Sequence, residues 1–267
     1  LINALKITQQ DIRNVRFALV GMGAANVATL RLLLASGVSI GQIIATDSRG
    51  ILHRDRHDVA SSVADFPDKW RLCQESNPDN RRGDTAEALQ GAHVCIAFAK
   101  PGPGTIKPEW VAGMERNSIV FACSNPVPEI WPWEAKEAGV RIVGTGRSDF
   151  PNQLNNSLGF PAIFRGALDV RARTITDEMC LAAAAEIARF GEEKGLDDEH
   201  IVPDMQDWDV FPCEAVAVGM KAQEQGLAQV QMTREDLFAV SSAKMRHARE
   251  MVELLMREGA IAPVPEA

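Results

Sequence analysis

The sequence predicts an α/β protein with a doubly wound, Rossmann-like, mostly parallel sheet and a C-terminal helical extension. Three observations lead to this fold. Short apolar runs alternate with helical patterns over the first 150 residues, a glycine-rich turn joins the first run to its helix, and only helical patterns follow Phe150. The chain has 267 residues, 46% of them hydrophobic, which is enough to bury a core without a disulfide or a metal.

Five apolar runs bounded by turn residues are typical of strands that are buried on both faces. They are Arg16–Val20, Gly41–Thr46, Val94–Ala99, Ser118–Cys123 and Val140–Gly144. The helical patterns between them are Ala24–Ser36, Thr85–Leu89, Pro108–Met114 and Trp133–Ala138. Right-handed crossovers through these helices would make the sheet parallel. The stretch 49–82 is polar and poorly periodic, and we expect a loop there with room for one helix.

The later part of the chain shows helical periodicity only. Its candidate helices are Ala162–Ala172, Asp177–Phe190, Cys213–Glu224 and Arg234–Arg257. We therefore expect one dinucleotide-binding domain over 1–267, with a Rossmann core at about 12–150 and a helical part at about 151–267. Because the chain begins with Leu1 and not with methionine, we also expect it to be a piece of a longer protein.

Composition argues against several partners. The net charge is −8 and no stripe of lysine or arginine occurs, so we expect no binding to nucleic acid. No apolar run approaches the roughly 20 residues that cross a bilayer, so we expect no membrane span. The five cysteines have no CxxC spacing, which favours reduced thiols and a cytoplasmic location.

A glycine-rich turn follows the first predicted strand and opens the first long helix. It reads Gly21-Met22-Gly23-Ala24. In the GxGxxG motif the first glycine allows a tight turn, and the second lets a pyrophosphate approach the backbone at the helix N-terminus. The third position usually carries a small residue, whereas this chain has Asn26. The turn therefore predicts a dinucleotide site with one departure from the motif, although a glycine turn of another α/β protein is the alternative.

An acidic residue follows the second predicted strand. Asp47 lies 26 positions after Gly21, whereas the motif places an acid that binds the adenosine ribose about 20 residues on. A slightly longer helix and loop account for the difference. The charge of Asp47 would repel the 2′-phosphate of NADP and so favours NAD. Arg49 and Arg54 lie close in sequence and could instead accept that phosphate. The sequence thus leaves NAD and NADP open, with NAD preferred.

Amide side chains gather after the fourth and fifth predicted strands. The segments are Ser124–Glu129 (SNPVPE) and Thr145–Asn156 (TGRSDFPNQLNN). Ligands of open α/β sheets bind beyond the carboxyl ends of the strands, and amides can bind a carboxylate or carboxamide there without adding charge. Asn125 could equally start a turn, because Asn-Pro is common in turns.

These two segments, followed by GFPAIFRGALDVRA at Gly159–Ala172 and preceded by ILHRDR at Ile51–Arg56, resemble successive signatures of the malic enzyme family. The resemblance extends over essentially the whole chain. It implies the NAD(P)-binding domain of an enzyme that oxidises L-malate with NAD or NADP and decarboxylates it to pyruvate and CO₂, with Mg²⁺ or Mn²⁺. It also implies a homo-oligomer.

Position by position, the resemblance implies roles for individual residues. Those that would contact the cofactor are Gly21, Gly23, Ala24, Asp47, Phe98, Ala99, Asn125 and Asn155. Those that would contact malate are Asn125, Asn155 and Asn156. Besides Asn26, the chain departs from the usual pattern at Cys123, Val127 and Phe98–Lys100.

The family's general acid is a tyrosine, its general base a lysine, and its metal ligands come from FED-like and NDD-like segments. This chain has no tyrosine and neither segment. We therefore expect an N-terminal catalytic and metal domain outside this chain, no catalytic residue and no metal ligand within it, and no turnover by the chain alone. Asp149 and Asp169 lie in the signatures, but we expect capping or salt-bridge roles for them.

Other readings stay open at this point. A malolactic-type enzyme shares the family's signatures and releases lactate in place of pyruvate. A stand-alone dinucleotide-binding module without catalysis is a hypothesis of another class. An amino-acid dehydrogenase-like Rossmann protein is less well supported, since those families do not carry the NQLNN–GFP segment.

Overall fold

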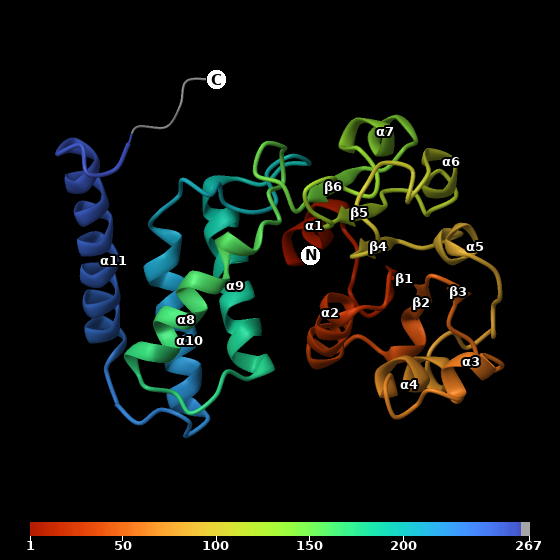
Figure 1. Ribbon diagram of the computed structural model, residues 1–267, viewed down its shortest axis with the longest axis horizontal. Coiled ribbons are helices and arrows are strands. Elements are labelled where there is room, and N and C mark those ends of the chain that lie inside the picture. Colours follow the sequence, from red (N-terminus) through yellow and green to blue (C-terminus); the bar gives the residue numbers. More distant parts are fainter. Residues whose placement is uncertain (263–267) are drawn as a thin grey trace. The chain divides into compact units, whose positions relative to one another are not determined.

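The computed structural model describes residues 1–262, and its chain divides into two compact units (Figure 1). Unit 1 consists of Leu1–Leu158 and Ile187–Gln206, and unit 2 consists of Gly159–Glu186 and, among the described residues, 207–262. The segment Ile187–Gln206 thus lies with the sheet, whereas the sequence assigned it to the helical part.

Unit 1 contains a six-stranded sheet in the order β3-β2-β1-β4-β5-β6. All neighbouring strands are parallel except β2 and β3, which form a short antiparallel pair. The strands are β1 (Phe17–Val20), β2 (Ile43–Asp47), β3 (Gly50–Ile51), β4 (Val94–Ala97), β5 (Ile119–Ala122) and β6 (Ile142–Thr145). The predicted doubly wound, mostly parallel sheet is confirmed, and its order reverses between β1 and β4.

Helices cover both faces of this sheet (Figure 1). Those of unit 1 are α1 (Ile2–Thr8), α2 (Ala24–Ala35), α3 (His57–Ala60), α4 (Pro67–Glu75), α5 (Thr85–Leu89), α6 (Pro108–Val111) and α7 (Pro132–Glu137), with short 3₁₀ turns at Ile40–Gln42 and Asn156–Leu158. The prediction for 49–82 was incomplete, because β3, α3 and α4 all lie there. Helix α1 was not predicted either.

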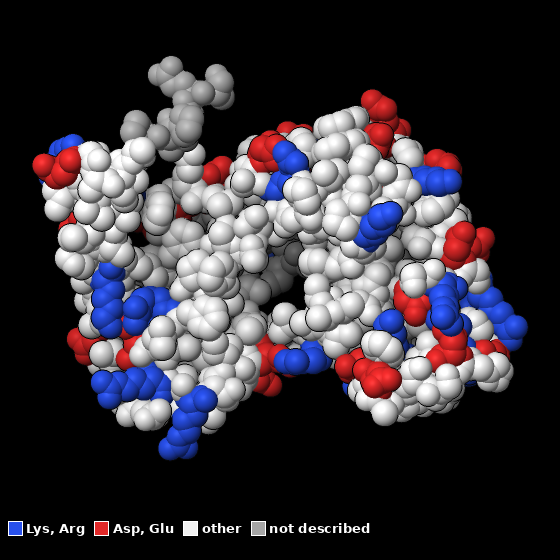
Figure 2. Space-filling model, viewed as in Figure 1, with Lys and Arg blue, Asp and Glu red and all other residues white. Residues whose placement is uncertain are grey.

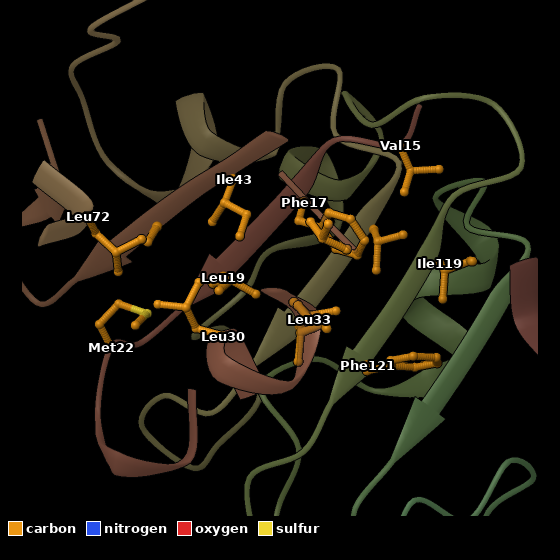
Figure 3. Packing of buried hydrophobic residues seen from close by; sticks show 14 of the residues in the cluster. Val15, Phe17, Leu19, Met22, Leu30, Leu33, Ile43, Leu72, Ile119 and Phe121 are labelled. Atoms are coloured by element: carbon orange, nitrogen blue, oxygen red, sulfur yellow. The ribbon is translucent and has the colours of Figure 1, made fainter. Parts of the chain in front are cut away.

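The alternation of side chains along each strand sorts the core into two layers. Phe17 and Leu19 of β1 pack with Leu30 and Leu33 of α2, as Figure 3 shows. Ala18 and Val20 of β1 point to the other face, where residues of α5, α6 and α7 cover them. Every residue of β1 is buried. The apolar run that predicted this strand is therefore a strand covered from both sides, which fixes the loops at its ends.

Unit 2 is helical. It contains α8 (Phe160–Asp169), α10 (Val210–Glu224), α11 (Arg234–Arg257) and the first part of α9 (Asp177–Lys194). Its core joins Val170, Met179, Val216, Val218 and Leu237. Thr233 caps α11 through a hydrogen bond from the Asp236 N–H, so this helix begins where the sequence placed it.

The surface carries charges of both signs. Figure 2 shows Lys and Arg next to Asp and Glu over the visible face, without a broad field of one sign. No helix within residues 1–262 is long and apolar enough to span a membrane. No disulfide joins the five cysteines.

Candidate functional site

The loops that carry the predicted site residues meet at one edge of the sheet. β1, β2, β4, β5 and β6 are parallel, so the turns that follow them lie at their common carboxyl edge. The order of the sheet reverses between β1 and β4, and open α/β sheets bind ligands at this point. The turn after β1 is therefore the centre of the candidate site.

The two glycines of this turn have different physical roles. Gly21 has φ +86°, and a Cβ there would lie 2.5 Å from the Phe98 carbonyl oxygen and 2.8 Å from the Ala99 Cα. Gly23 is the N-cap of α2, and a Cβ there would meet no atom within 4 Å. Gly21 is thus required by the fold itself, whereas Gly23 keeps a space open in front of the helix.

The start of α2 faces that space. The first N–H groups of a helix have no partner within the helix, and the helix dipole makes this end positive. Ala24 is exposed there, and no acidic side chain occurs in the first turn. An anionic pyrophosphate would find N–H donors and no repelling charge at this position.

Asn26, the departure from the motif, stabilises the turn through hydrogen bonds from its buried side chain. It is fully buried, and its Nδ2 donates to the carbonyl oxygens of Val20 at 3.0 Å and Gly21 at 3.1 Å. A third contact of 3.4 Å reaches the Ile96 carbonyl oxygen of β4. The amide therefore ties the turn to two neighbouring strands, a role that a glycine or alanine could not supply.

Asp47 ends β2 and is held by positively charged side chains. Both carboxylate oxygens accept from the Arg56 Nη2, at 3.1 and 3.0 Å, and the Lys69 Nζ lies 3.6 Å away. The Arg49 N–H also donates to Asp47, at 3.0 Å. Arg56 further pairs with Asp58, whose pKa it holds well below the ordinary value. Sequence reasoning named Arg49 and Arg54, and it missed Arg56 and Lys69.

Phe98 and Ala99 follow β4 beside the glycine turn. The Phe98 N–H donates to the Val20 carbonyl oxygen at 3.0 Å, and the Ala99 N–H donates to the Glu129 carboxylate at 2.8 Å. Glu129 is fully buried and also accepts from the N–H and hydroxyl of Ser124. Burial and then this negative charge raise the pKa of Cys123 to about 12, so that thiol stays protonated. Glu129 is a further residue that the sequence did not single out.

The structure brings Asn125 and Asn155 together around Gly146. A Cβ at Gly146 would lie 3.0 Å from the Asn125 Nδ2 and 2.7 Å from the Cys123 carbonyl oxygen. The Asn155 Nδ2 donates to the Gly146 carbonyl oxygen at 2.8 Å, and its Oδ1 accepts from the Ser157 N–H and hydroxyl. Asn125 and Asn156 are exposed. Two loops thus present three amides at the same edge as the glycine turn.

The other polar residues of the signatures support the fold. Asn152 has φ +55°, its Nδ2 donates to the Val143 and Asp198 carbonyl oxygens, and its Oδ1 accepts from the Ile201 N–H. Asp149 pairs with Arg147, and Asp169 pairs with Arg165. The salt-bridge roles expected for the two aspartates are confirmed.

The residues present do not fit a divalent metal. No group of three or more His, Cys, Asp or Glu side chains suited to a metal ion occurs among residues 1–262. A divalent cation needs several such ligands at short range, and the described part of the chain does not bring them together.

Comparison with known proteins gives the family. Residues 139–223 match the family model described as malic enzyme, NAD binding domain. The NAD-dependent malic enzyme of Geobacillus stearothermophilus is 43% identical over 229 residues, which cover 86% of this chain and 46% of that protein. The bifunctional malic/malolactic enzyme of Bacillus subtilis is 39% identical over 241 residues, which cover 89% of this chain and 56% of that protein.

The structural comparison agrees. The crystal structure of Entamoeba histolytica malic enzyme matches with a TM-score of 0.94 and 43% identity, over 99% of this chain and 54% of that one. The chain thus spans about half the length of each of these three relatives. With the glycine turn, Asp47 and the amide loops at one edge of a doubly wound sheet, this chain belongs to the malic enzyme family and corresponds to its NAD-binding domain.

Proposed function

We propose that this chain is the dinucleotide-binding half of an enzyme that oxidises and decarboxylates L-malate to pyruvate and CO₂. The observation that carries the proposal is the carboxyl edge, where the open space at Gly23, the N-terminus of α2 and the carboxylate of Asp47 lie on adjacent strands. This arrangement fits a pyrophosphate flanked by an adenosine ribose. Malate as the substrate is supported by the names of the relatives.

The residues take the following roles in this proposal. The turn Gly21–Ala24 holds the pyrophosphate, Asp47 accepts a hydrogen bond from the adenosine ribose, and Phe98 and Ala99 lie along the cofactor. The side-chain amides of Asn125, Asn155 and Asn156 bind the nicotinamide ribose and the malate carboxylate. NAD held by these residues would supply the acceptor for a hydride from C2 of malate.

The remaining chemistry needs groups beyond this set. Oxidation of malate needs a base for its hydroxyl proton, and decarboxylation gains from a metal that stabilises the enolate. The family's tyrosine acid has no counterpart here, because the chain contains no tyrosine. We expect the 267-residue chain to bind dinucleotide but to give no NADH when malate and Mn²⁺ are added.

Gly23→Ala tests the dinucleotide site. A Cβ at this position meets nothing in the protein, so the stability should change by no more than about 1 kcal/mol, the size of an N-cap effect. The same methyl group enters the space in front of α2, so the dissociation constants of NAD and NADP should both rise at least tenfold. Isothermal titration calorimetry measures the affinities, and thermal unfolding measures the stability.

Gly41→Ala is the matched control. Its nearest neighbour would be the Ser39 Oγ at 3.8 Å, and it lies before β2, at the amino edge of the sheet. Its affinity for NAD should equal that of the wild type. Equal affinity of the Gly23→Ala variant would place the pyrophosphate elsewhere, and a folded wild-type chain that binds neither dinucleotide would contradict the proposal.

We further propose that NAD is preferred over NADP. Asp47 would face the 2′-phosphate of NADP with a negative charge, while Arg56 and Lys69 are already engaged with that carboxylate. Asp47→Asn removes the repulsion and frees Lys69 from its carboxylate partner, while Arg56 keeps its pair with Asp58. The ratio of NAD to NADP affinity should therefore fall at least tenfold, mainly through tighter binding of NADP, as measured by calorimetry at constant ionic strength.

Asp65→Asn serves as the control for this change, because Asp65 is an exposed carboxylate that precedes α4. It removes the same charge from unit 1 and should leave the ratio within threefold of the wild-type value. An unchanged ratio in the Asp47→Asn variant would assign the discrimination to other residues.

A malolactic reaction is the second candidate, because the Bacillus subtilis relative is named as a bifunctional malic/malolactic enzyme. Product analysis of the active protein separates the two, since lactate marks the malolactic reaction and pyruvate the oxidative one. A non-catalytic dinucleotide-binding module predicts neither product.

We also place the protein in the cytoplasm as a homo-oligomer. The support is the set of five cysteines without a disulfide and the exposed apolar side chains of α11, such as Val252 and Leu255. Sedimentation of the purified protein as a monomer would contradict the oligomer.

A further inference from the structure

Glu129 is a buried carboxylate whose three hydrogen-bond donors are uncharged. It accepts from the Ala99 N–H at 2.8 Å, from the Ser124 N–H at 3.2 Å and from the Ser124 Oγ at 2.6 Å. A carboxylate out of contact with water is costly unless such donors satisfy it. Through these three bonds, Glu129 connects the loop that contains Ala99 to the loop that contains Ser124.

The two loops belong to neighbouring strands. Ala99 follows β4 and Ser124 follows β5, and these strands are paired in parallel. The main chain around Glu129 adds two links, from the Ile106 N–H to the Glu129 carbonyl oxygen and from the Gly102 N–H to the Val127 carbonyl oxygen. The turn after β4 and the segment that carries Asn125 are thus held to each other by both main chain and side chain.

The position of these loops identifies the part of the ligand that they serve. In a doubly wound sheet a dinucleotide crosses the point where the strand order reverses, with its pyrophosphate at the turn after β1. Asp47 at the end of β2 marks the adenosine half. The other half then lies beyond β4 and β5, where Glu129 ties the loops.

We infer that Glu129 is a positioning residue that sets the loops after β4 and β5 for the nicotinamide half of the cofactor and leaves the adenosine half unaffected. The inference rests on the proposed function, because it assumes that the edge binds a dinucleotide. Glu129 acts through Ala99, Ser124 and Asn125 and does not itself reach the ligand, since it is fully buried.

The hydroxyl of Ser124 explains why position 129 needs a carboxylate and not an amide. Its oxygen lies 2.6 Å from Glu129 Oε1 and 3.0 Å from the Ala99 carbonyl oxygen, but it has one proton to donate. Glutamine at 129 offers one acceptor oxygen in place of two. The NH₂ group of its amide would face the Ser124 N–H, so that two donors meet without an acceptor between them. The volume of glutamine is almost the same as that of glutamate.

The test compares whole and partial ligands. Calorimetry gives the affinities of the wild type, Glu129→Gln and Ser124→Ala for NAD and for ADP, which carries the adenosine and two phosphates without the nicotinamide riboside. Glu129→Gln should lower the affinity for NAD at least tenfold and leave the affinity for ADP within twofold of the wild-type value. Ser124→Ala, which loses only the hydroxyl link, should weaken NAD about threefold, again with ADP unchanged. Glu109→Gln removes an exposed carboxylate from α6 and should change neither affinity.

Each other outcome has a distinct meaning. Equal losses of affinity for NAD and ADP would mean that Glu129 stabilises the fold in general, and they would overturn the inference. An unchanged affinity for NAD would overturn it as well. If Glu129→Gln does not fold, Ser124→Ala decides by the same comparison. Both of the contradicting results leave the proposed function standing, because the wild type still binds NAD. A folded wild type that binds neither NAD nor NADP would overturn the proposed function together with the inference.

Discussion

Replacing Glu214 by glutamine should raise the free energy of unfolding of unit 2 by about 3 kcal/mol at pH 7 and by almost nothing near pH 4.5. Glu214 lies in α10 and is fully buried, and neither carboxylate oxygen has a hydrogen-bond partner among the described residues. Burial alone raises the pKa of this carboxyl from 4.5 to about 9. The folded protein therefore carries a neutral Glu214 over most of the physiological range.

The sign of the pH dependence follows from proton binding. Between pH 4.5 and about 9 the unfolded chain has lost the proton of Glu214 while the folded chain retains it. Raising the pH then favours unfolding, by about 1.4 kcal/mol per unit. Glutamine has no such proton, and its buried amide costs about as much as the neutral carboxyl does. The free energy of unfolding of the variant should thus equal that of the wild type near pH 4.5, and it should exceed the wild-type value by more as the pH rises.

Urea unfolding at pH 5, 6, 7 and 8, followed by circular dichroism, measures the difference in the free energy of unfolding between the two proteins. Other titrating groups are common to both and cancel. Glu250→Gln, at an exposed position of α11, is the control and should give a difference that does not vary with pH. Parallel pH profiles for wild type and Glu214→Gln would mean that water or a shifted side chain solvates the carboxyl.

Much of the sheet was predictable because its signals are local. The strand β1 is an apolar run between a polar segment and a glycine, and both faces of the sheet bury it. The turn at Gly21 and the acid at Asp47 were predictable for the same reason, since the motif spans one strand, one helix and the next strand. The predicted bounds of helix α11 agree with the observed ones at both ends, because Thr233 caps the helix and a long periodic pattern follows this residue.

The missed elements are short. β3 has two residues and α3 has four, so neither carries a periodic pattern that can be distinguished from a loop. α4 starts at Pro67, which could have indicated the first turn of a helix, but its apolar residues are few. α1 has seven residues and ends at Gln9 in a left-handed conformation, without the glycine that usually marks such an end.

The missed site residues depend on the order of the strands. Glu129 meets Ala99 across 30 positions of sequence, and only the pairing of β4 with β5 brings their loops together. Lys69 reaches Asp47 from α4, a helix that the sequence did not place. Arg56 lies within the resembling ILHRDR segment, yet nothing in its spacing distinguishes it from Arg54. Motifs along the chain identify the centre of the site, and the fold adds the residues that hold it.

Gly166→Ala should destabilise unit 2 by more than about 3 kcal/mol, the upper end of ordinary overpacking. A Cβ at Gly166 of α8 would lie 2.2 Å from the Ala215 carbonyl oxygen of α10 and 3.0 Å from the Val218 Cβ. Alanine is the better helix former by about 1 kcal/mol, so propensity alone predicts a gain. The contact is with main chain and cannot be relieved by rotation of a side chain, so the steric cost exceeds that gain and α8 and α10 must separate. Hydrogen exchange of the two helices, with urea unfolding, measures the loss.

Gly219→Ala provides the comparison from the same helix pair. Its Cβ would lie 3.3 Å from the Gly166 carbonyl oxygen, 3.2 Å from the Val170 Cγ1 and 2.6 Å from the Leu237 Cδ2, which is the far end of a flexible side chain. Rotation of Leu237 can relieve this contact, so we expect a loss of about 1 kcal/mol, with the cost of repacking partly offset by helix propensity. If Gly166→Ala proves as mild as Gly219→Ala, then α8 and α10 can slide apart without loss, and the close approach of their backbones does not stabilise unit 2. A large loss at Gly166 alone would explain physically why the GFPAIFRGALD segment carries a glycine in the middle of a helix.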